Sequence, residues 1–368
     1  MSVASDPVLE FGVFDHLDQG GRRPSDFFEQ RLRLVEKYDR AGFYAFHPAE
    51  HHGTPLSLSP SPNIFLAAAA ARTSRIRLAP LVYVLPLYRP LRLIEEICTL
   101  DHLSKGRIEI GVGRGIAPFE LVINGINPLE AWDIFRETLE VLERGLGART
   151  LTYHGRYHNF SNVPLVLEPY QKPHPPFWYG VFKDPESAVM PARKGWNICG
   201  ITSSTSIGAS VARYLEIWRE ANAEKPRTLP KLGMHRIVVV GDSDARAEEL
   251  ARKAVTSYKD SLNYLWNRFG AKAAQLPESF ESMRESDLLV AGNPDSVRTE
   301  LARQARAAGV NYCAVKFSLG DLTDADTERS IELFVQHVMP AFAPRPEELL
   351  RGCRSGGAPR ALGEAWPG

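Results

Sequence analysis

The chain has 368 residues, which is enough to bury the core of one large α/β domain or of two ordinary domains. Lys plus Arg and Asp plus Glu both number 44, so the formal net charge is zero and no overall basic field attracts nucleic acid or an anionic membrane. The N-terminus lacks a signal-peptide pattern, and no window approaches the roughly 18 apolar residues of a membrane span, so we expect a small-molecule partner.

Short β-rich runs alternate with helical patterns along the chain. Strands are expected at residues 9–15, 43–46, 76–85, 107–113, 176–182, 197–201, 232–240 and 311–318. Helices are expected at residues 26–42, 62–74, 89–106, 129–146, 185–195, 206–222, 244–262, 294–309 and 324–342. This alternation indicates βαβ units, and the apolar strands indicate a parallel sheet that is buried on both faces.

Eight strands with helices between them predict a (β/α)8 TIM barrel, whose typical size of about 250 residues leaves room for insertions. The expected insertions follow the fourth and seventh strands, at roughly 150–175 and 260–291. We expect residues 1–343 to form one barrel domain and residues 344–368, which lose periodicity and gain Gly, Pro and Arg, to form a disordered tail. An open doubly wound sheet is the alternative architecture.

The four cysteines are far apart and form no CxxC pair, so they predict neither a zinc ribbon nor a disulfide framework. A reducing cytoplasm is the expected location. The cysteines are Cys98, Cys199, Cys313 and Cys353.

The stretch "HPAEHHG" follows the expected second strand. His47-Pro-Ala-Glu50-His51 matches the H-x-x-E-H pattern of inverted zinc peptidases, but Pro48 disfavours the helix that would place both histidines on one face. We therefore expect no metal. At the carboxyl end of a barrel strand, where active sites are built, His51, His52 and Glu50 favour proton transfer, although one histidine can instead bond loop backbone while another packs.

Two later segments suggest contacts with a phosphate. "GVGRG" lacks the third glycine of a dinucleotide fingerprint, yet Gly113 lets backbone approach a ligand, and Arg114 can hold a phosphate; the alternative is a surface turn with a solvated arginine. Lys183 and Ser187 flank a helix start that can bind phosphate, whereas the simpler interpretation is an ordinary cap with Asp184 as the capping residue.

These segments, in this order, resemble the bacterial luciferase-like flavin monooxygenase family from about Phe11 to Phe342. The most specific part is "RPLRLIEEICTLDHLSKGRIEIGVGRG", supported by "AEHH", "PYQKPHPPFWYG" and "DPESAVMPARKG". The resemblance implies a (β/α)8 barrel that takes reduced FMN (FMNH2) from a separate flavin reductase. It also implies that O2 then oxygenates a small organic substrate through a peroxyflavin. A homodimer, built near "LAAAAARTS", is also implied.

The resemblance further implies roles for individual residues. His51 matches the family histidine near the reactive part of the flavin, with Glu50 and His52 beside it. Arg114 matches the arginine on the FMN phosphate. Leu81 and Val82 fall where some members have a non-prolyl cis peptide against the flavin ring. The rest of the phosphate cradle is implied to come from Lys183, Asp184 and Ser187.

Two departures from the family pattern bear on these roles. Trp132 stands where many members place an arginine, which implies that one phosphate contact is missing or replaced. Gly113 stands where the light-emitting subunit has a cysteine, which is expected to open space over the flavin and argues against a light emitter.

Two other functions stay open within this resemblance. One is a reductase that uses a deazaflavin or tightly held FMN without O2, and the other is a non-catalytic flavin-binding subunit. Aromatic residues are expected either to line the substrate pocket or to pack the first insertion onto the barrel. These aromatic residues, with His154 and His158 beside them, are Tyr153, Tyr157, Phe160, Trp178 and Tyr179.

Overall fold

The computed structural model describes residues 6–19, 23–223, 228–270 and 279–344. Residues 345–368 of the expected C-terminal tail lie outside this range. The strands are β1 (Glu10–Asp15), β2 (Ala45–Pro48), β3 (Arg77–Leu78), β4 (Tyr83–Val84), β5 (Ile110–Gly113), β6 (Thr150–His154), β7 (Asn159–Pro164), β8 (Phe177–Val181), β9 (Asn197–Gly200), β10 (Leu232–Val240), β11 (Leu289–Gly292) and β12 (Tyr312–Lys316).

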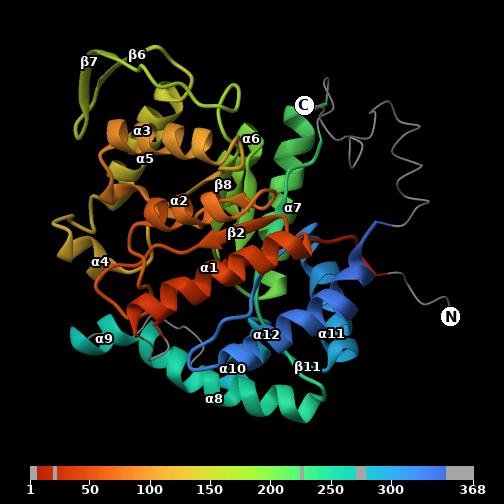
Figure 1. Ribbon diagram of the computed structural model, residues 1–368. Helices are drawn as coiled ribbons and strands as arrows, with labels where there is room; N and C mark the ends of the chain where they lie inside the picture. The colour runs from red at the N-terminus through yellow and green to blue at the C-terminus, as the bar shows by residue number, and fades with distance from the viewer. Residues whose placement is uncertain (1–5, 20–22, 224–227, 271–278, 345–368) are drawn as a thin grey trace, which may run out of the picture.

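Helices separate most of these strands and cover the sheet (Figure 1). The α-helices are α1 (Pro24–Ala41), α2 (Pro62–Arg72), α3 (Pro90–Leu103), α4 (Pro118–Ile123), α5 (Ala131–Gly145), α6 (Val189–Lys194), α7 (Ser204–Ala221), α8 (Asp244–Leu262), α9 (Tyr264–Arg268), α10 (Phe280–Glu285), α11 (Pro294–Ala308) and α12 (Asp324–Leu333). Short η segments lie at Leu85–Leu87, Pro185–Ala188, Phe334–Val338 and Met339–Phe342. In the described part of the chain, every helix is too short or too polar to span a lipid bilayer.

The main sheet is parallel and curled. Its strand order is β3-β2-β1-β12-β10-β9-β8-β5-β4, and β11 pairs with β10 off this path. The two end strands, β3 and β4, belong to the same short stretch, 77–84, and Leu78 also forms an isolated parallel bridge with Ile108. A flat open sheet would hold its end strands far apart, so the sheet must curve around an interior.

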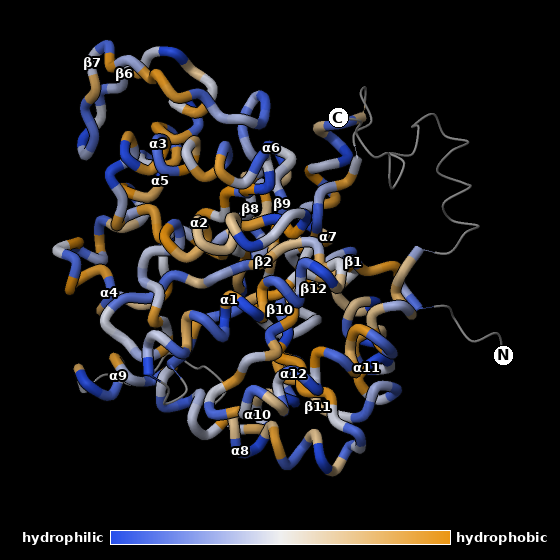
Figure 2. The backbone as a smooth tube through the Cα atoms, in the orientation of Figure 1, coloured by the Kyte–Doolittle hydropathy of each residue, from blue (hydrophilic) through white to orange (hydrophobic). Residues whose placement is uncertain are grey.

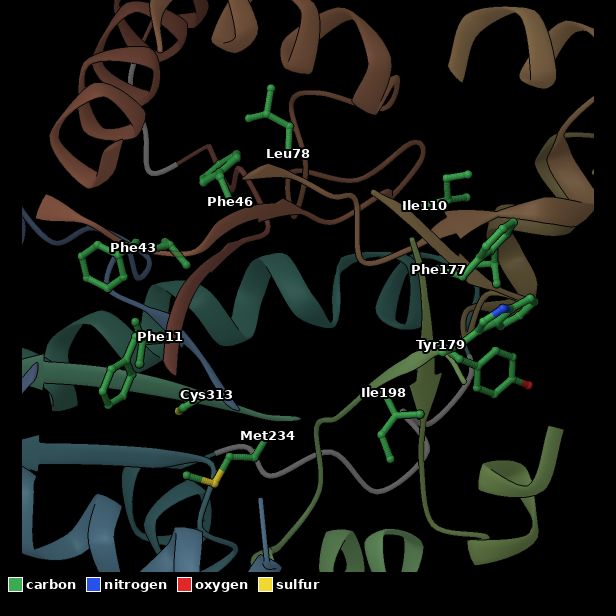
Figure 3. Close-up of a cluster of buried hydrophobic side chains, with 14 of the residues drawn as sticks. Phe11, Phe43, Phe46, Leu78, Ile110, Phe177, Tyr179, Ile198, Met234 and Cys313 are labelled. Carbon is green, nitrogen blue, oxygen red and sulfur yellow. The ribbon is translucent and has the colours of Figure 1, made fainter. Parts of the chain in front are cut away.

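Alternating strand residues point to the two faces of this sheet, as the period of two requires. Cys313 belongs to the large cluster between sheet and helices, which also contains Phe11, Phe46, Ile110 and Met234 (Figure 3). The flanking residues Tyr312 and Ala314 belong to a separate interior cluster that also contains Phe14, Ala49, Ala79, Trp178 and Cys199. In Figure 2 hydrophobic colour gathers on the central strands, whereas hydrophilic residues colour much of the surrounding helices.

The stretches expected as insertions contain structure of their own. Residues 150–164 form the antiparallel hairpin β6–β7, which stands apart from the main sheet at the top of Figure 1. The second stretch contains α9, α10 and β11, and the sequence analysis was wrong to omit a strand there. Residues 289–292 are only four residues long and pair with the far end of β10, Ile237–Val240, so no alternating pattern marks them.

Candidate functional site

A cavity of about 270 Å³ opens where the strands of the curled sheet end. Its size lies near the lower limit of ligand pockets, about 300–1,000 Å³. The lining residues are Phe14, His16, Ala49, Glu50, His51, Leu81, Val82, Val84, Gly113, Arg114, Gly115, Ile116, Glu120, Trp132, Tyr179, Gly180, Val181, Phe182, Cys199, Ile201 and His235. The expected site residues Glu50, His51, Leu81, Val82, Gly113 and Arg114 therefore meet at one place, whereas His52, Lys183, Asp184 and Ser187 do not line it.

His51 is held inside this cavity by a carboxylate that the sequence analysis did not single out. Its Nδ1 atom lies 2.8 Å from Oε1 of Glu120, which is on the short helix α4 and is buried. The ring of His51 also stacks on that of His16, with centroids 5.5 Å apart. A carboxylate that binds Nδ1 fixes the orientation and tautomer of an imidazole and leaves Nε2 to exchange a proton.

Glu50 contacts the protein through both of its carboxylate oxygens. Oε2 accepts hydrogen bonds from the backbone N–H of Val84 and the hydroxyl of Tyr88, both at 2.9 Å. Oε1 lies 2.8 Å from Nε2 of His52. Burial lowers the pKa of His52, but this carboxylate outweighs burial and raises the pKa above its ordinary value. Glu50 therefore fastens the end of β2 to β4, and His52 supports it from outside the cavity.

The peptide bond between Leu81 and Val82 is cis, as the family resemblance implies, and both residues line the cavity. Two glycines of β5 make room for this stretch. A Cβ at Gly111 would collide with the carbonyl oxygen of Pro80, and a Cβ at Gly113 would lie 2.5 Å from Cγ2 of Val82. The expectation that Gly113 opens free space was therefore wrong, because the side chain of Val82 occupies that space.

Arg114 lies at the cavity with its guanidinium over the ring of Trp132, 5.0 Å from the ring centroid. It makes no hydrogen bond or ion pair with the residues that the structure describes, so its donors can serve a ligand. Burial raises the pKa of the neighbouring Tyr179, and the charge of Arg114 opposes that rise. Trp132 thus contacts the arginine by a cation–π interaction.

The sequence of the chain is similar to those of known proteins. A family model described as luciferase-like monooxygenase matches residues 9–312, which is more than half of the chain. The chain belongs to the luciferase-like monooxygenase family. An uncharacterized protein, y4wF of Sinorhizobium fredii, is 40% identical over 85% of this chain and 92% of its own length. Limonene 1,2-monooxygenase of Rhodococcus erythropolis is 28% identical over 94% of this chain and 89% of its own length.

Other similar proteins bear on the cofactor. The oxygenase component of flavin-dependent trigonelline monooxygenase from Acinetobacter baylyi is 25% identical over 72% of this chain and 71% of its own. Among solved structures, monooxygenase RslO1 of Streptomyces bottropensis has a TM-score of 0.81 at 24% identity, covering 91% of this chain and 100% of its own. The oxygenating constituent of 3,6-diketocamphane monooxygenase from Pseudomonas putida, in complex with FMN, has a TM-score of 0.75 at 22% identity, with coverages of 92% and 99%.

A structure with a different cofactor shares the fold. A coenzyme F420 dependent tetrahydromethanopterin reductase from Methanopyrus kandleri has a TM-score of 0.66 at 20% identity, covering 92% of this chain and 100% of its own. These TM-scores show that the chain shares its fold with these three enzymes. At these sequence identities, the solved structures establish the fold of the chain but do not identify its cofactor.

Within this luciferase-like chain, the segment implied to complete a phosphate cradle has the geometry of a cap. Asp184 precedes a short 3-10 helix, Pro185–Ala188, and its Oδ1 accepts a hydrogen bond of 3.0 Å from the N–H of Glu186. The hydroxyl of Ser187 donates to the carbonyl of Asp184 at 2.6 Å. Lys183 lies 5.8 Å from the centroid of the Phe182 ring. The segment continues from cavity-lining Phe182, and its phosphate role stays a prediction.

The zinc pattern of "HPAEHH" does not form a joint site. His47 lies within β2, where its Nδ1 donates to the carbonyl of Ala79 at 2.8 Å and its Nε2 accepts from the hydroxyl of Tyr312 at 2.7 Å. His51 is directed to Glu120 instead. Among the described residues no group of three His, Cys, Asp or Glu side chains is placed to hold a metal ion.

Sequence reasoning missed three polar residues of the cavity: His16, Glu120 and His235. His16 directly follows β1, so the rule that barrel sites lie at strand ends could have identified it. His235 and the neighbouring Arg236 interrupt a strand that is apolar on both sides of them, which is also a usable signal. Glu120 lies in "APFELVI", where no pattern distinguishes it from a solvated helix residue.

Two buried cations and two buried carboxylates lie close to these histidines. Nζ of Lys316 is 3.0 Å from Oδ1 of Asp18 and 3.6 Å from Oδ1 of Asp15, and Arg31 approaches Asp15 at 3.3 Å. Burial, reinforced by the charge of Lys316, holds the pKa of His16 well below its usual range. A neutral imidazole is therefore expected there at neutral pH.

The aromatic residues of the first insertion do not line the cavity. Tyr153 and Phe160 pack against the main core, and the hydroxyl of Tyr157 donates to Glu130 at 3.2 Å. Trp178 is fully buried in the interior cluster and donates its ring N–H to Glu109. Of the aromatic residues expected to contact substrate, only Tyr179 lines the cavity. The packing alternative holds for Tyr153 and Phe160.

Proposed function

We propose that this protein is the oxygenase component of a two-component flavin-dependent monooxygenase. It takes reduced FMN from a separate flavin reductase and uses O2 to oxygenate a small organic substrate. The observation that carries the proposal is the meeting of the His51–Glu120 pair, the Leu81–Val82 cis peptide and Arg114 in one cavity. Relatives whose names include an oxygenase component and an oxygenating constituent support the separate reductase.

The residues present fit FMN. The mostly apolar wall formed by Leu81, Val82 and Gly113 suits the face of a flat flavin ring, while Arg114 supplies an unshared bidentate donor for the phosphate. The segment containing Lys183, Asp184 and Ser187 is proposed to complete the phosphate cradle. When bound, the reduced flavin supplies the electrons that activate O2.

The protein's own side chains then manage protons and exclude water. Nε2 of His51 is proposed to give or take the proton of the reacting centre, while Glu120 holds the ring at Nδ1. Glu50 keeps the end of β2 against β4 through Val84 and Tyr88, which holds His51 in place; His52 supports Glu50. The apolar lining limits water, which favours transfer of oxygen to the substrate over release of hydrogen peroxide.

A deazaflavin-dependent reductase without oxygen insertion is the second candidate, because a coenzyme F420 dependent enzyme shares the fold. Equilibrium binding separates the two candidates. We expect the full chain to bind reduced FMN more tightly than oxidised FMN and reduced coenzyme F420. Preference for reduced coenzyme F420 over reduced FMN would contradict the monooxygenase proposal.

Three further properties belong to the same proposal. The sheet is proposed to close as a (β/α)8 barrel through β4 and β5, with residues 1–343 as one domain and insertions after its fourth and seventh strands. The enzyme is proposed to act in the cytoplasm, where reduced flavin is produced. A homodimer is expected near α2, and sedimentation of the purified chain would measure its state.

A further inference from the structure

On the side of the cavity across from the proposed flavin face, the lining includes the polar side chain of His235. His235 lies on β10, which in the strand order is separated from β4 by β9, β8 and β5 on one side and by β12, β1, β2 and β3 on the other. Because the sheet is curled, β10 lies across the cavity from Leu81 and Val82. Both groups line the same cavity, so a molecule beside the flavin ring would meet His235.

The hydrogen bonding of His235 fixes which ring nitrogen carries the proton. Its Nδ1 lies 3.0 Å from the carbonyl oxygen of Ala314, which can only accept. Nδ1 must therefore carry the hydrogen, and in a neutral ring Nε2 carries a lone pair. Nε2 has no hydrogen-bond partner among the residues that the structure describes.

The surroundings keep this imidazole neutral. Burial lowers the pKa of His235 to about 3, and the charges of Lys316 and Arg236 add to that effect. The ring of Phe14 packs beside it, with centroids 4.5 Å apart. His235 is thus largely buried, fixed and uncharged, and a ligand that covers its Nε2 without donating a hydrogen bond would leave that acceptor unpaired, which is costly.

We propose that Nε2 of His235 is a specificity determinant that accepts a hydrogen bond from a hydroxyl or N–H group of the substrate. That this ligand is the substrate rests on the proposed function, whereas the acceptor atom of His235 is present whether or not flavin binds. The site favours molecules that place an apolar body in the cavity and a donor against β10. Ethers and hydrocarbons of the same size lack the matching donor.

Phenol and toluene test this property because they have similar size and differ by a hydroxyl in place of a methyl group. Their affinities are measured by calorimetric titration of the full chain without flavin. The ratio of phenol to toluene affinity is expected to fall about 3- to 10-fold in His235→Phe relative to the wild type. His235→Gln, which offers an amide oxygen, should recover part of the ratio. The control is His158→Phe, a buried histidine outside the cavity.

A second measurement on the wild type needs no variant to fold. Nitrogen-15 NMR of the His235 ring should show a protonated Nδ1 and an unprotonated Nε2. The chemical shift of Nε2 should change when phenol is added and should not change when toluene is added. An unchanged affinity ratio, a protonated Nε2, or no phenol binding at its solubility limit would each overturn the proposal. If His235→Phe instead weakens the binding of reduced FMN at least tenfold and leaves the ratio of phenol to toluene affinity unchanged, His235 contacts the flavin and the proposal is wrong. Failure of the wild type to bind reduced FMN would affect only the proposed function.

Discussion

His51 and Glu120, which lie 69 residues apart in the sequence, share a contact of 2.8 Å inside the cavity. Glu120 is on α4, in the loop region after β5, whereas His51 follows β2. The short helix therefore delivers the carboxylate that orients the histidine, and an isolated histidine on a strand end would lack that restraint. The proposed proton transfer depends on this pair.

Replacement of His51 by Ala should impair O2 chemistry while leaving flavin binding largely intact. General acid–base groups contribute about 10²–10⁴-fold in rate, so we expect hydrogen peroxide release after O2 mixing to change by at least about tenfold, with reduced FMN affinity within about threefold of the wild type. Glu120→Gln, which keeps the shape but loses the charge, should give a smaller change. Unchanged peroxide release in His51→Ala would remove its proposed role.

Arg114→Ala should weaken the binding of FMN because a contact with the FMN phosphate is lost. A charged hydrogen bond contributes about 1.5–3 kcal/mol, so reduced FMN affinity should fall roughly 10- to 100-fold. Reduced riboflavin, which lacks the phosphate, should bind both proteins alike. Arg92→Ala removes an exposed arginine of α3 that pairs with Glu96, and serves as the control. Equal losses for both flavins would place Arg114 at the ring instead of the phosphate.

Gly113→Ala should destabilise the fold because the new methyl group meets Val82 at 2.5 Å. Overpacking of this kind costs about 1–3 kcal/mol, and the unfolding free energy from urea denaturation measures it. Gly180→Ala is a matched control, since its Cβ would lie 3.7 Å from the same Val82 side chain, an ordinary contact. Equal stability of the two variants would show that Val82 moves aside freely.

The buried His47 should make the fold less stable as the pH falls. Burial lowers its folded pKa from 6.5 to about 4, so between these values the unfolded chain binds a proton that the folded chain does not. Its stabilisation is present above pH 6.5 and is lost as pH falls to about 4. At about 1.36 kcal/mol per pKa unit, the loss is about 3 kcal/mol.

Urea denaturation across this pH range, for the wild type and His47→Gln, measures the effect. The variant should be less stable at pH 7 but should lose less unfolding free energy on acidification. His102→Gln replaces an exposed histidine and should follow the wild-type curve. Parallel curves for His47→Gln and the wild type would mean that His47 takes up its proton without unfolding.

Most strands of the expected sheet could be read from the sequence because they are largely apolar and alternate with helical patterns. The expected strand 76–85 was wrong as a single strand, because it forms the short strands β3 and β4 on either side of the Leu81–Val82 cis peptide. The site residues at strand ends, such as His51 and Arg114, follow from the same order. Glu120 could not be predicted, because its role depends on how a six-residue helix folds back over the cavity. The position of the Val82 side chain beside Gly113 could not be predicted either, since only the packed backbone shows that it fills this space.

The decisive experiment on the proposed oxygenase activity is stopped-flow spectroscopy. The anaerobic complex of the protein with reduced FMN is mixed with O2, and the absorbance is followed over time. We expect the wild-type protein to bind reduced FMN, and we expect O2 then to produce a long-lived absorbance change before the oxidised flavin spectrum appears. The lifetime should shorten in His51→Ala. Tight binding of reduced FMN followed by direct conversion to the oxidised spectrum, with no delay, would contradict a monooxygenase and favour a reductase.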